Sequence, residues 1–207
     1  MDPKTEQRLM LNREDRITEE LISSGLLFLD APIVPEIASK FNKSLLYLAM
    51  KHKKEDKKPI WIYLDSLGGF VPSGLAIYDV ISASVSDGVV INILGVGVVA
   101  SMALTIMQAA GRGHRFSLPH TQFLLHQVSQ ESVGSAEYNQ VKEQTAEMER
   151  INKLVMGIVA EGAKIDLEKL LQLSEKKNCW FSPMDAKKFG ELGLIDEVLS
   201  TLPFPLV

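Results

Sequence analysis

Short apolar runs alternate along the chain with stretches in which apolar residues recur at helical spacing. The runs at 26–29, 60–64 and 89–93 are rich in Leu, Ile and Val, and they predict buried strands. Helical spacing begins at Pro35 and again near Leu75, after the first and the second of these runs. Strands that alternate with helices predict an α/β fold, in which helices cover a mostly parallel sheet.

The second half of the chain continues this alternation with shorter strands and longer helices. Strands are predicted at 114–117 and 122–128. A long amphipathic helix follows at about 135–161, and its length predicts that it projects from the domain. Asp166 is expected to cap the next helix, and Ser182 begins a Ser-x-x-acid capping box for the last one.

The longest uncharged stretch lies between Asp87 and Arg112. Its length alone satisfies the criterion for a membrane span. However, β-branched residues dominate its first part, glycines follow at Gly95 and Gly97, and polar residues interrupt the remainder. These features favour a buried strand, a turn at the glycines and a buried helix that starts at Ser101. We therefore expect no membrane association.

Composition and charge narrow the classes of function. The 207 residues are 46% hydrophobic, enough for one large core, and the formal net charge of −4 argues against nucleic acid as the main partner. The mixed-sign run at 51–58 is interpreted as a solvated loop. The single cysteine, Cys179, allows no internal disulfide, and the polar N-terminus contains no apolar signal segment. A cytoplasmic location is the expectation.

Three features are candidates for chemistry. Gly68 and Gly69 follow a predicted strand, where they form either an anion-binding turn or only a tight turn. Ser101 begins a predicted helix, so it is either a nucleophile beside the helix dipole or simply the helix cap. His126 ends an apolar strand, where it is either a base for a serine or a core histidine. The sequence has neither metal-ligand spacing nor a nucleotide-binding glycine loop.

Six short motifs are spread over residues 16–199. They are Asp65-Ser-Leu-Gly-Gly69, Ser73-Gly-Leu-Ala-Ile-Tyr-Asp79, Ala100-Ser-Met102, Gly113-His-Arg-Phe-Ser-Leu-Pro119, Leu125-His-Gln127 and Phe189-Gly-Glu-Leu-Gly-Leu-Ile-Asp196. In content and order they resemble the proteolytic subunit of the Clp protease (ClpP) family. The resemblance implies the layered α/β fold that this family shares with crotonases, with a mostly parallel sheet, covering helices and a projecting handle helix.

The resemblance also implies a serine endopeptidase. By correspondence of the motifs, Ser101 is the nucleophile and His126 is the general base. The backbone N–H groups of Gly68 and Met102 would form the oxyanion hole. Residues 127–134 correspond to the segment on which substrates pair as added β-strands.

Organisation and partners follow from the same resemblance. Residues 1–15 form an N-terminal segment at an axial pore, 16–200 a single domain with the handle at 135–161, and 201–207 a C-terminal tail. Two stacked seven-membered rings, homo- or hetero-oligomeric, are expected to enclose a chamber for protein and peptide substrates. A Clp-family AAA+ unfoldase would use ATP, so this chain itself is expected to bind no cofactor and no metal.

The third triad position departs from the family pattern. Alignment on Trp180-Phe-Ser182 places Asn178 where the family has an aspartate. An asparagine can orient the imidazole, but it has no charge to stabilise the imidazolium, so low intrinsic activity is expected. Asp185 is a nearby carboxylate, but its place in the capping box explains it without catalysis.

Further departures lie on the oxyanion side of the site. Leu67 replaces the family's proline, Phe70 replaces a smaller residue, and 88–97 is longer than usual. We therefore expect a divergent paralogue that works with a second, more typical ClpP isoform. Two rival interpretations stay open. One is a catalytically inactive ring subunit, and the other is a crotonase-type hydratase or isomerase, for which Asp65 would be the acidic residue near the glycines.

Overall fold

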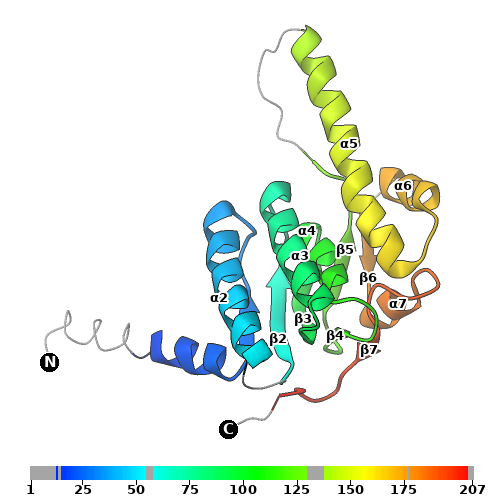
Figure 1. The fold of residues 1–207 in the computed structure, drawn as a ribbon. Helices are drawn as coiled ribbons and strands as arrows, with labels where there is room; N and C mark the ends of the chain where they lie inside the picture. The colour runs from blue at the N-terminus through cyan, green and yellow to red at the C-terminus, as the bar shows by residue number, and fades with distance from the viewer. Residues whose placement is uncertain (1–12, 14, 55–57, 130–137, 177, 205–207) are drawn as a thin grey trace, which may run out of the picture.

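A computed structural model describes residues 13, 15–54, 58–129, 138–176 and 178–204 of the chain. They form a seven-stranded sheet with helices packed on one face and a further helix that extends away from it (Figure 1). Residues 15–23 are helical. The labelled elements in chain order are β1 (Leu26–Leu29), α2 (Pro35–Lys54), β2 (Ile60–Ser66), α3 (Val71–Ser86), β3 (Ile91–Ala100), α4 (Met102–Met107), the 3₁₀ helix η1 (Gln108–Ala110), β4 (Arg115–Ser117), β5 (Gln122–Leu125), α5 (Tyr138–Ala163), α6 (Leu167–Lys176), β6 (Cys179–Phe181), α7 (Pro183–Lys188) and β7 (Glu197–Val198).

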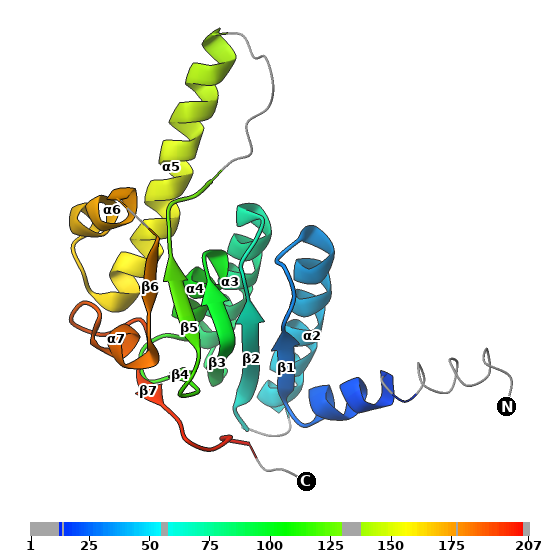
Figure 2. The ribbon, with the colours of Figure 1, turned by 180° about the vertical axis from the view of Figure 1, so that it is seen from behind.

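The sheet is parallel except at β6, which confirms the predicted α/β class. Its strand order is β1-β2-β3-β4-β7, and β5 pairs parallel with β3 and antiparallel with β6. β3 pairs with β4 over 93–95 and with β5 over 98–100, so the sheet divides along this strand. The carboxyl ends of β3 and β5 therefore lie side by side (Figure 2).

The core lies between the sheet and the helices α2, α3 and α4, which cover one face (Figures 1 and 2). β2 shows the alternation that such a sheet requires. Ile60, Ile62 and Leu64 are buried under the helices, whereas Trp61 and Tyr63 on the opposite face are only half-buried. Every residue of α4 is buried. The uncharged stretch is thus a buried strand followed by a buried helix, as predicted.

Two local predictions are wrong. Gly95 and Gly97 do not form a turn, because β3 continues through both residues to Ala100 and its last three residues pair with β5. The charge run at 51–58 is not wholly a loop, because α2 continues to Lys54. Residues 55–57 of that run lie outside the described residues.

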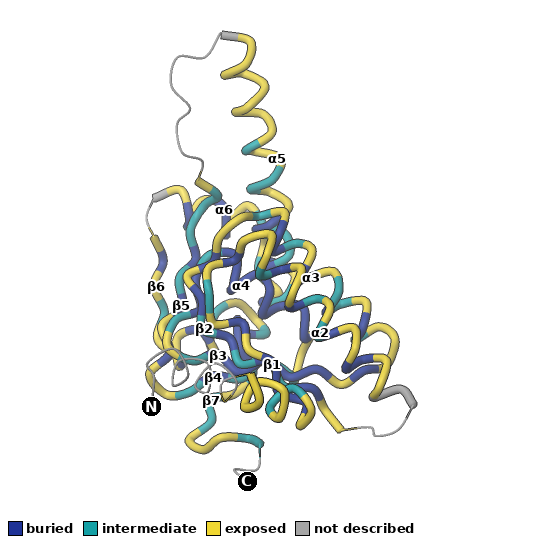
Figure 3. The backbone as a smooth tube through the Cα atoms, turned by 90° about the vertical axis from the view of Figure 1, so that its left-hand side faces the viewer, coloured by how far each residue is buried: buried dark blue, intermediate teal, exposed yellow. Residues whose placement is uncertain are grey.

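The long helix α5 begins within the described residues at Tyr138, while its expected start at Ser135 lies outside them. Its first half extends beyond the sheet and is exposed along its length (Figure 3). Val141 is 49% exposed there, whereas Val155 in the second half is 7% exposed. Only the second half of α5 therefore contributes to the core of the single chain. The predicted N-terminal segment at 1–15 lies mostly outside the described residues.

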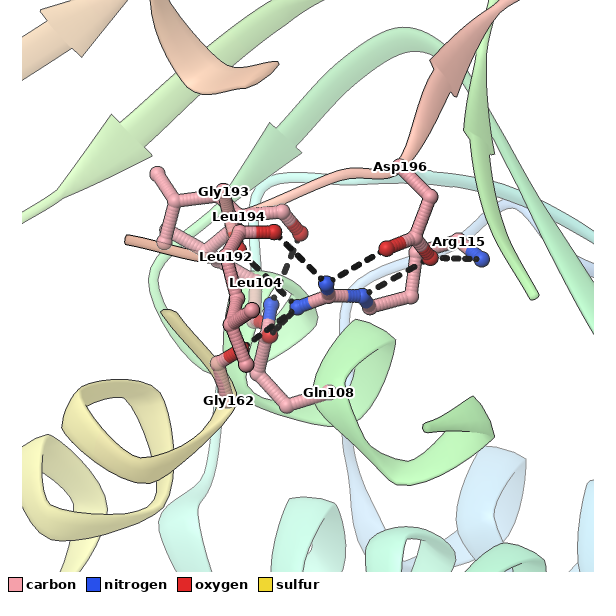
Figure 4. A network of polar contacts seen from close by, with 8 residues as sticks. All are labelled: Leu104, Gln108, Arg115, Gly162, Leu192, Gly193, Leu194 and Asp196. Carbon is pink, nitrogen blue, oxygen red and sulfur yellow. Dashed lines mark hydrogen bonds and ion pairs between the residues drawn. The ribbon is translucent and has the colours of Figure 1, made fainter. Parts of the chain in front are cut away.

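Arg115 on β4 is 1% exposed and organises a polar network that joins distant segments (Figure 4). Its guanidinium forms an ion pair with Asp196 at 2.7 Å. Its other side-chain acceptors are Gln108 Oε1 at 2.7 Å and the carbonyls of Gly162, Gly193 and Leu192 at 2.9, 3.0 and 3.2 Å. Burial of Asp196 opposes its ionisation, but the hydrogen bonds and charge of Arg115 lower its pKa. This network fixes β4, η1, the end of α5 and the C-terminal loop together.

Candidate active site

Ser101 lies between the end of β3 and the start of α4. Its backbone angles are φ 56° and ψ −124°, and in the described part of the chain Lys164 is the one other non-glycine residue with positive φ. Such a conformation costs a residue with a Cβ on the order of 1–3 kcal/mol and is typical of functional sites. Ser101 occupies the N-cap position of α4, but its side chain makes no capping hydrogen bond. A capping role therefore does not account for this serine.

His126 directly follows β5, and the pairing of β5 with β3 brings it close to Ser101. Ala100 pairs with Leu124, and the N–H of Ser101 donates to the carbonyl of Leu124 at 2.9 Å. Ser101 and His126 both line one cavity of about 60 Å³. The His126 side chain is half-buried and reaches this cavity, so a core role does not account for it.

Polar and apolar groups both form the walls of this cavity. The apolar lining residues are Val71, Met102, Leu125, Val128, Val155 and Met156. Thr105 and Ser129 add hydroxyl groups. Thr105 was not predicted as a site residue, although it lies one helical turn after Ser101 and therefore on the same face of α4. No sequence signal links Val155 and Met156 to the site, because they come from α5.

The two glycines after β2 lie against Ser101. A Cβ added to Gly68 would lie 2.7 Å from the carbonyl oxygen of Ala100, 2.8 Å from Ser101 Cβ and 2.9 Å from the backbone nitrogen of Met102. Only glycine therefore allows this approach. The N–H of Gly68, which was expected to be an oxyanion donor, instead donates to Ser66 Oγ at 3.1 Å.

The next glycine, Gly69, is oriented differently. Ile33 donates to the carbonyl of Gly68 at 2.9 Å and accepts from the N–H of Phe70 at 2.7 Å. In a parallel bridge these bonds flank Gly69, so its own N–H points to the other side, toward the cavity that it lines with Ser101. Met102 is the first residue of α4, where backbone N–H groups have no partner within the helix. These two N–H groups suit a negatively charged oxygen beside Ser101.

Asn178 immediately precedes β6, as His126 immediately follows the neighbouring strand β5. Leu125 pairs with Cys179 in antiparallel register, so His126 and Asn178 are the next facing positions. Asn178 is exposed and does not line the cavity. Among the described residues, no hydrogen bond joins Ser101 to His126 or His126 to Asn178. The structure therefore brings the three residues to one end of the sheet without a connected triad.

Asp185, the other nearby carboxylate, is engaged at the start of α7. It accepts a hydrogen bond from the Ser182 hydroxyl at 2.6 Å, and its N–H donates to Ser182 Oγ at 3.3 Å. This is the predicted capping box. Asp166 likewise caps α6, because its carboxylate accepts from the N–H of Lys169 at 3.0 Å.

Within the described ranges, no group of three or more His, Cys, Asp or Glu side chains is arranged to hold a metal ion. No helix in the same ranges is long and apolar enough to cross a membrane.

Comparisons with known proteins agree on one family. The family model described as Clp protease matches residues 10–201. The "ATP-dependent Clp protease proteolytic subunit 1" of Streptomyces coelicolor is 30% identical over 187 residues, which cover 90% of this chain and 80% of that protein. The "ATP-dependent Clp protease proteolytic subunit 2" of Corynebacterium diphtheriae is 29% identical over 196 residues, 95% and 92% of the two chains.

Among solved structures, an Asn-to-Asp mutant of ClpP1 from Listeria monocytogenes is similar in fold. Its TM-score is 0.75, with 26% sequence identity and coverage of 89% of this chain and 96% of that chain. The family match covers nearly all of the sequence, and the structural match covers nearly all of the fold. The chain therefore belongs to the Clp protease family.

Proposed function

We propose that this chain is a serine endopeptidase, the proteolytic subunit of an ATP-dependent Clp protease. The observation that carries the proposal is the surroundings of Ser101. This serine has a strained backbone, makes no capping bond, and lines the same cavity as His126. Relatives named as proteolytic subunits of the ATP-dependent Clp protease, similar over nearly the whole chain, support the same activity.

In the proposed reaction, Ser101 Oγ attacks the carbonyl carbon of a peptide bond while His126 accepts the hydroxyl proton. The tetrahedral intermediate then breaks its C–N bond, and His126 gives the proton to the departing amine. A water molecule next transfers a proton to His126 and attacks the ester. The acyl product leaves as a carboxylic acid, and the proton returns to Ser101.

We assign the oxyanion hole to the N–H groups of Gly69 and Met102, and this choice replaces the expected pair of Gly68 and Met102. The support for this assignment is that the Gly68 N–H already donates to Ser66, whereas Gly69 lines the cavity. Loss of one such donor typically costs about 10²–10³-fold in rate.

The cavity beside Ser101 suits a small side chain next to the scissile bond. Its volume is about 60 Å³, and polar and apolar groups line it in similar measure. Substrates would be unfolded proteins and peptides, since an extended backbone is needed to reach a serine placed beside a sheet. The segment expected to pair with substrate, 127–134, is described only up to Ser129.

The proposed setting is a cytoplasmic oligomer of two stacked heptameric rings. A Clp-family AAA+ unfoldase would deliver substrates and use ATP, and this chain would bind no cofactor. A second, more typical ClpP isoform would complete the active assembly. The support for that isoform is the neutral Asn178 in the place of an acidic residue.

One observation favours a second candidate function. Ser101, His126 and Asn178 are not connected by hydrogen bonds among the described residues, and the third of them has no charge. The alternative is a catalytically weak or inactive ring subunit that structures or regulates a complex with another isoform.

Labelling with a fluorophosphonate probe distinguishes the two functions. A competent nucleophile gives labelling of the wild-type chain that Ser101→Ala abolishes and that Ser44→Ala, a change on α2, leaves intact. Fluorogenic peptide hydrolysis is measured in parallel, with and without the second isoform. Absence of labelling in both assemblies would refute the peptidase function and leave the regulatory one.

A further inference from the structure

The pairing of β2 with β3 contains an irregularity just before the proposed nucleophile. Residues 64–66 of β2 span 95–99 of β3, so a single residue, Asp65, faces three residues of the neighbouring strand. Within this bulge Gly97 adopts φ 56°. Bulges bend a strand, redirect the side chains that follow, and recur beside active sites. Here the bulged strand leads directly into Ser101.

The carboxylate of Asp65 fills the bulge. Its Oδ1 accepts a hydrogen bond from the N–H of Val98 at 3.0 Å. A Cβ added to Gly97 would lie 2.7 Å from both carboxylate oxygens, so the carboxylate packs directly against the backbone of Gly97. A charged acceptor makes a stronger bond to a backbone N–H than a neutral one does. Asp65 thus holds the bulge from the side of β2.

The next residue, Ser66, holds the loop that contains Gly68 and Gly69. Its hydroxyl donates to the carbonyl of Ala31 at 2.7 Å and accepts from the N–H of Gly68 at 3.1 Å. Two consecutive side chains of β2 therefore fix the strand that leads to Ser101 and the loop that contains Gly69. Asp65 itself does not line the cavity of Ser101 and His126, so it does not supply the acidic group that a crotonase-type mechanism needs there.

We infer that Asp65 is a positioning residue, whose carboxylate fixes the β3 bulge and thereby the place of Ser101 relative to the oxyanion donors Gly69 and Met102. The inference rests on the proposed peptidase function. Its physical reason is that a displacement of about 1 Å at a reacting group can cost about 10²-fold in rate. Without the carboxylate, the Val98 N–H loses its acceptor, and the bulge can relax.

The first test compares three variants of the full-length assembled protein. Asp65→Ala removes the acceptor and should slow fluorophosphonate labelling of Ser101 by about 10–100-fold, with kcat for a peptide lowered and KM nearly unchanged. Asp65→Asn keeps an oxygen that can accept from Val98 and should stay within about threefold of wild type. Asp79→Ala removes an exposed carboxylate on α3 and is the matched control.

The second test uses the contact between Gly97 and the carboxylate. Gly97→Ala places a methyl group against both oxygens and should slow labelling by about tenfold or more when Asp65 is present. In the Asp65→Ala background the clash with the carboxylate is gone and only the backbone strain at φ 56° remains, so the same change should slow labelling clearly less than it does when Asp65 is present. If the rate losses of the two single variants simply multiply in the double variant, the methyl group does not act through the carboxylate, and the inference is overturned.

Hydrogen exchange provides a readout that does not depend on activity. Asp65→Ala should accelerate exchange of the Val98 amide by about tenfold or more, whereas Asp65→Asn should leave it protected. The Ile93 amide, which donates to the carbonyl of His114, is the internal control. Unchanged Val98 exchange in Asp65→Ala, or faster exchange without slower labelling, would contradict the positioning role. A wild-type chain that is not labelled at Ser101 would instead refute the peptidase function.

Discussion

Replacing Asn178 by aspartate is the most direct perturbation of the proposed active site. We predict that Asn178→Asp raises kcat/KM for peptide hydrolysis. The substitution keeps the shape of the side chain and its accepting oxygen, and it adds a negative charge beside His126. Because the imidazole becomes positively charged as it takes the proton of Ser101, that charge stabilises the transition state more than the ground state.

The size of the gain follows from the register of β5 and β6. Residues 126 and 178 each lie one position beyond the last paired residues, Leu125 and Cys179. Facing residues of an antiparallel pair have Cβ atoms about 4.5–5.5 Å apart, so with this register continued the charged groups would approach to about 4 Å. An opposite-charge pair at about 4 Å is worth about 1 kcal/mol in water and about 4 kcal/mol at an effective dielectric constant near 20. Because Asn178 is exposed, the lower part of this range applies, about 1–2 kcal/mol, or about 5- to 30-fold in rate.

The assay is hydrolysis of a fluorogenic peptide by the chain alone. Ser101→Ala in the Asn178→Asp background must abolish the gain. Asp185→Asn is the matched control, and it should leave the rate within about twofold, because that carboxylate is bonded to the Ser182 cap and not to His126. A rate at or below that of the unsubstituted chain, with Ser101 still labelled, would show that position 178 does not assist His126.

Three further sets of substitutions test the parts of the fold that support the site. Arg115→Met leaves the Asp196 carboxylate without its buried partner, so it should lower the free energy of unfolding by about 3–5 kcal/mol in urea. The folded chain lowers the pKa of Asp196, so this carboxylate contributes its full stability above the ordinary pKa of 3.8 and loses it at lower pH. The melting temperature of the parent should therefore fall more steeply below pH 3.8 than that of Asp196→Asn. Gly74→Ala forces a methyl group into the side chain of Met102 and should slow labelling of Ser101 by about tenfold. Ser182→Ala removes the N-cap of α7 and should cost about 1 kcal/mol in urea denaturation.

Each of these predictions has a control or a contrary outcome. Equal unfolding free energies for the parent and Arg115→Met would contradict the role of the network. Parallel melting curves for the parent and Asp196→Asn below pH 3.8 would contradict the direction of the pKa shift. Leu75→Ala, next to Gly74 on α3, should leave the labelling rate near that of the parent. Ser182→Thr keeps a hydroxyl that can accept from the Asp185 N–H and donate to its carboxylate, so it should recover most of the loss in Ser182→Ala.

Predictions from the sequence succeeded where the signal lies within a few residues. The apolar run of β2, the proline that opens α2 and the caps at Asp166 and Ser182 are local features, and the structure has each of them. Such local signals predicted the residues of the site only in part. From the residues alone, Ser101 could also be a helix cap and His126 a core histidine. The family resemblance identified them as nucleophile and general base.

Only the tertiary structure decided what depends on contacts between distant segments. Pairing with β5 continues β3 past Gly97 to Ala100. Hydrogen bonds to Ile33 orient the loop that contains Gly68 and Gly69, and residues of α5 form one wall of the cavity. The short strands β6 and β7 were not predicted either, because two or three residues contain no periodicity of their own. The sequence by itself determined most of the longer strands and helices, since backbone preference and apolar spacing act locally. Which N–H group faces Ser101 depends instead on hydrogen bonds between strands, and those exist only once the sheet has formed.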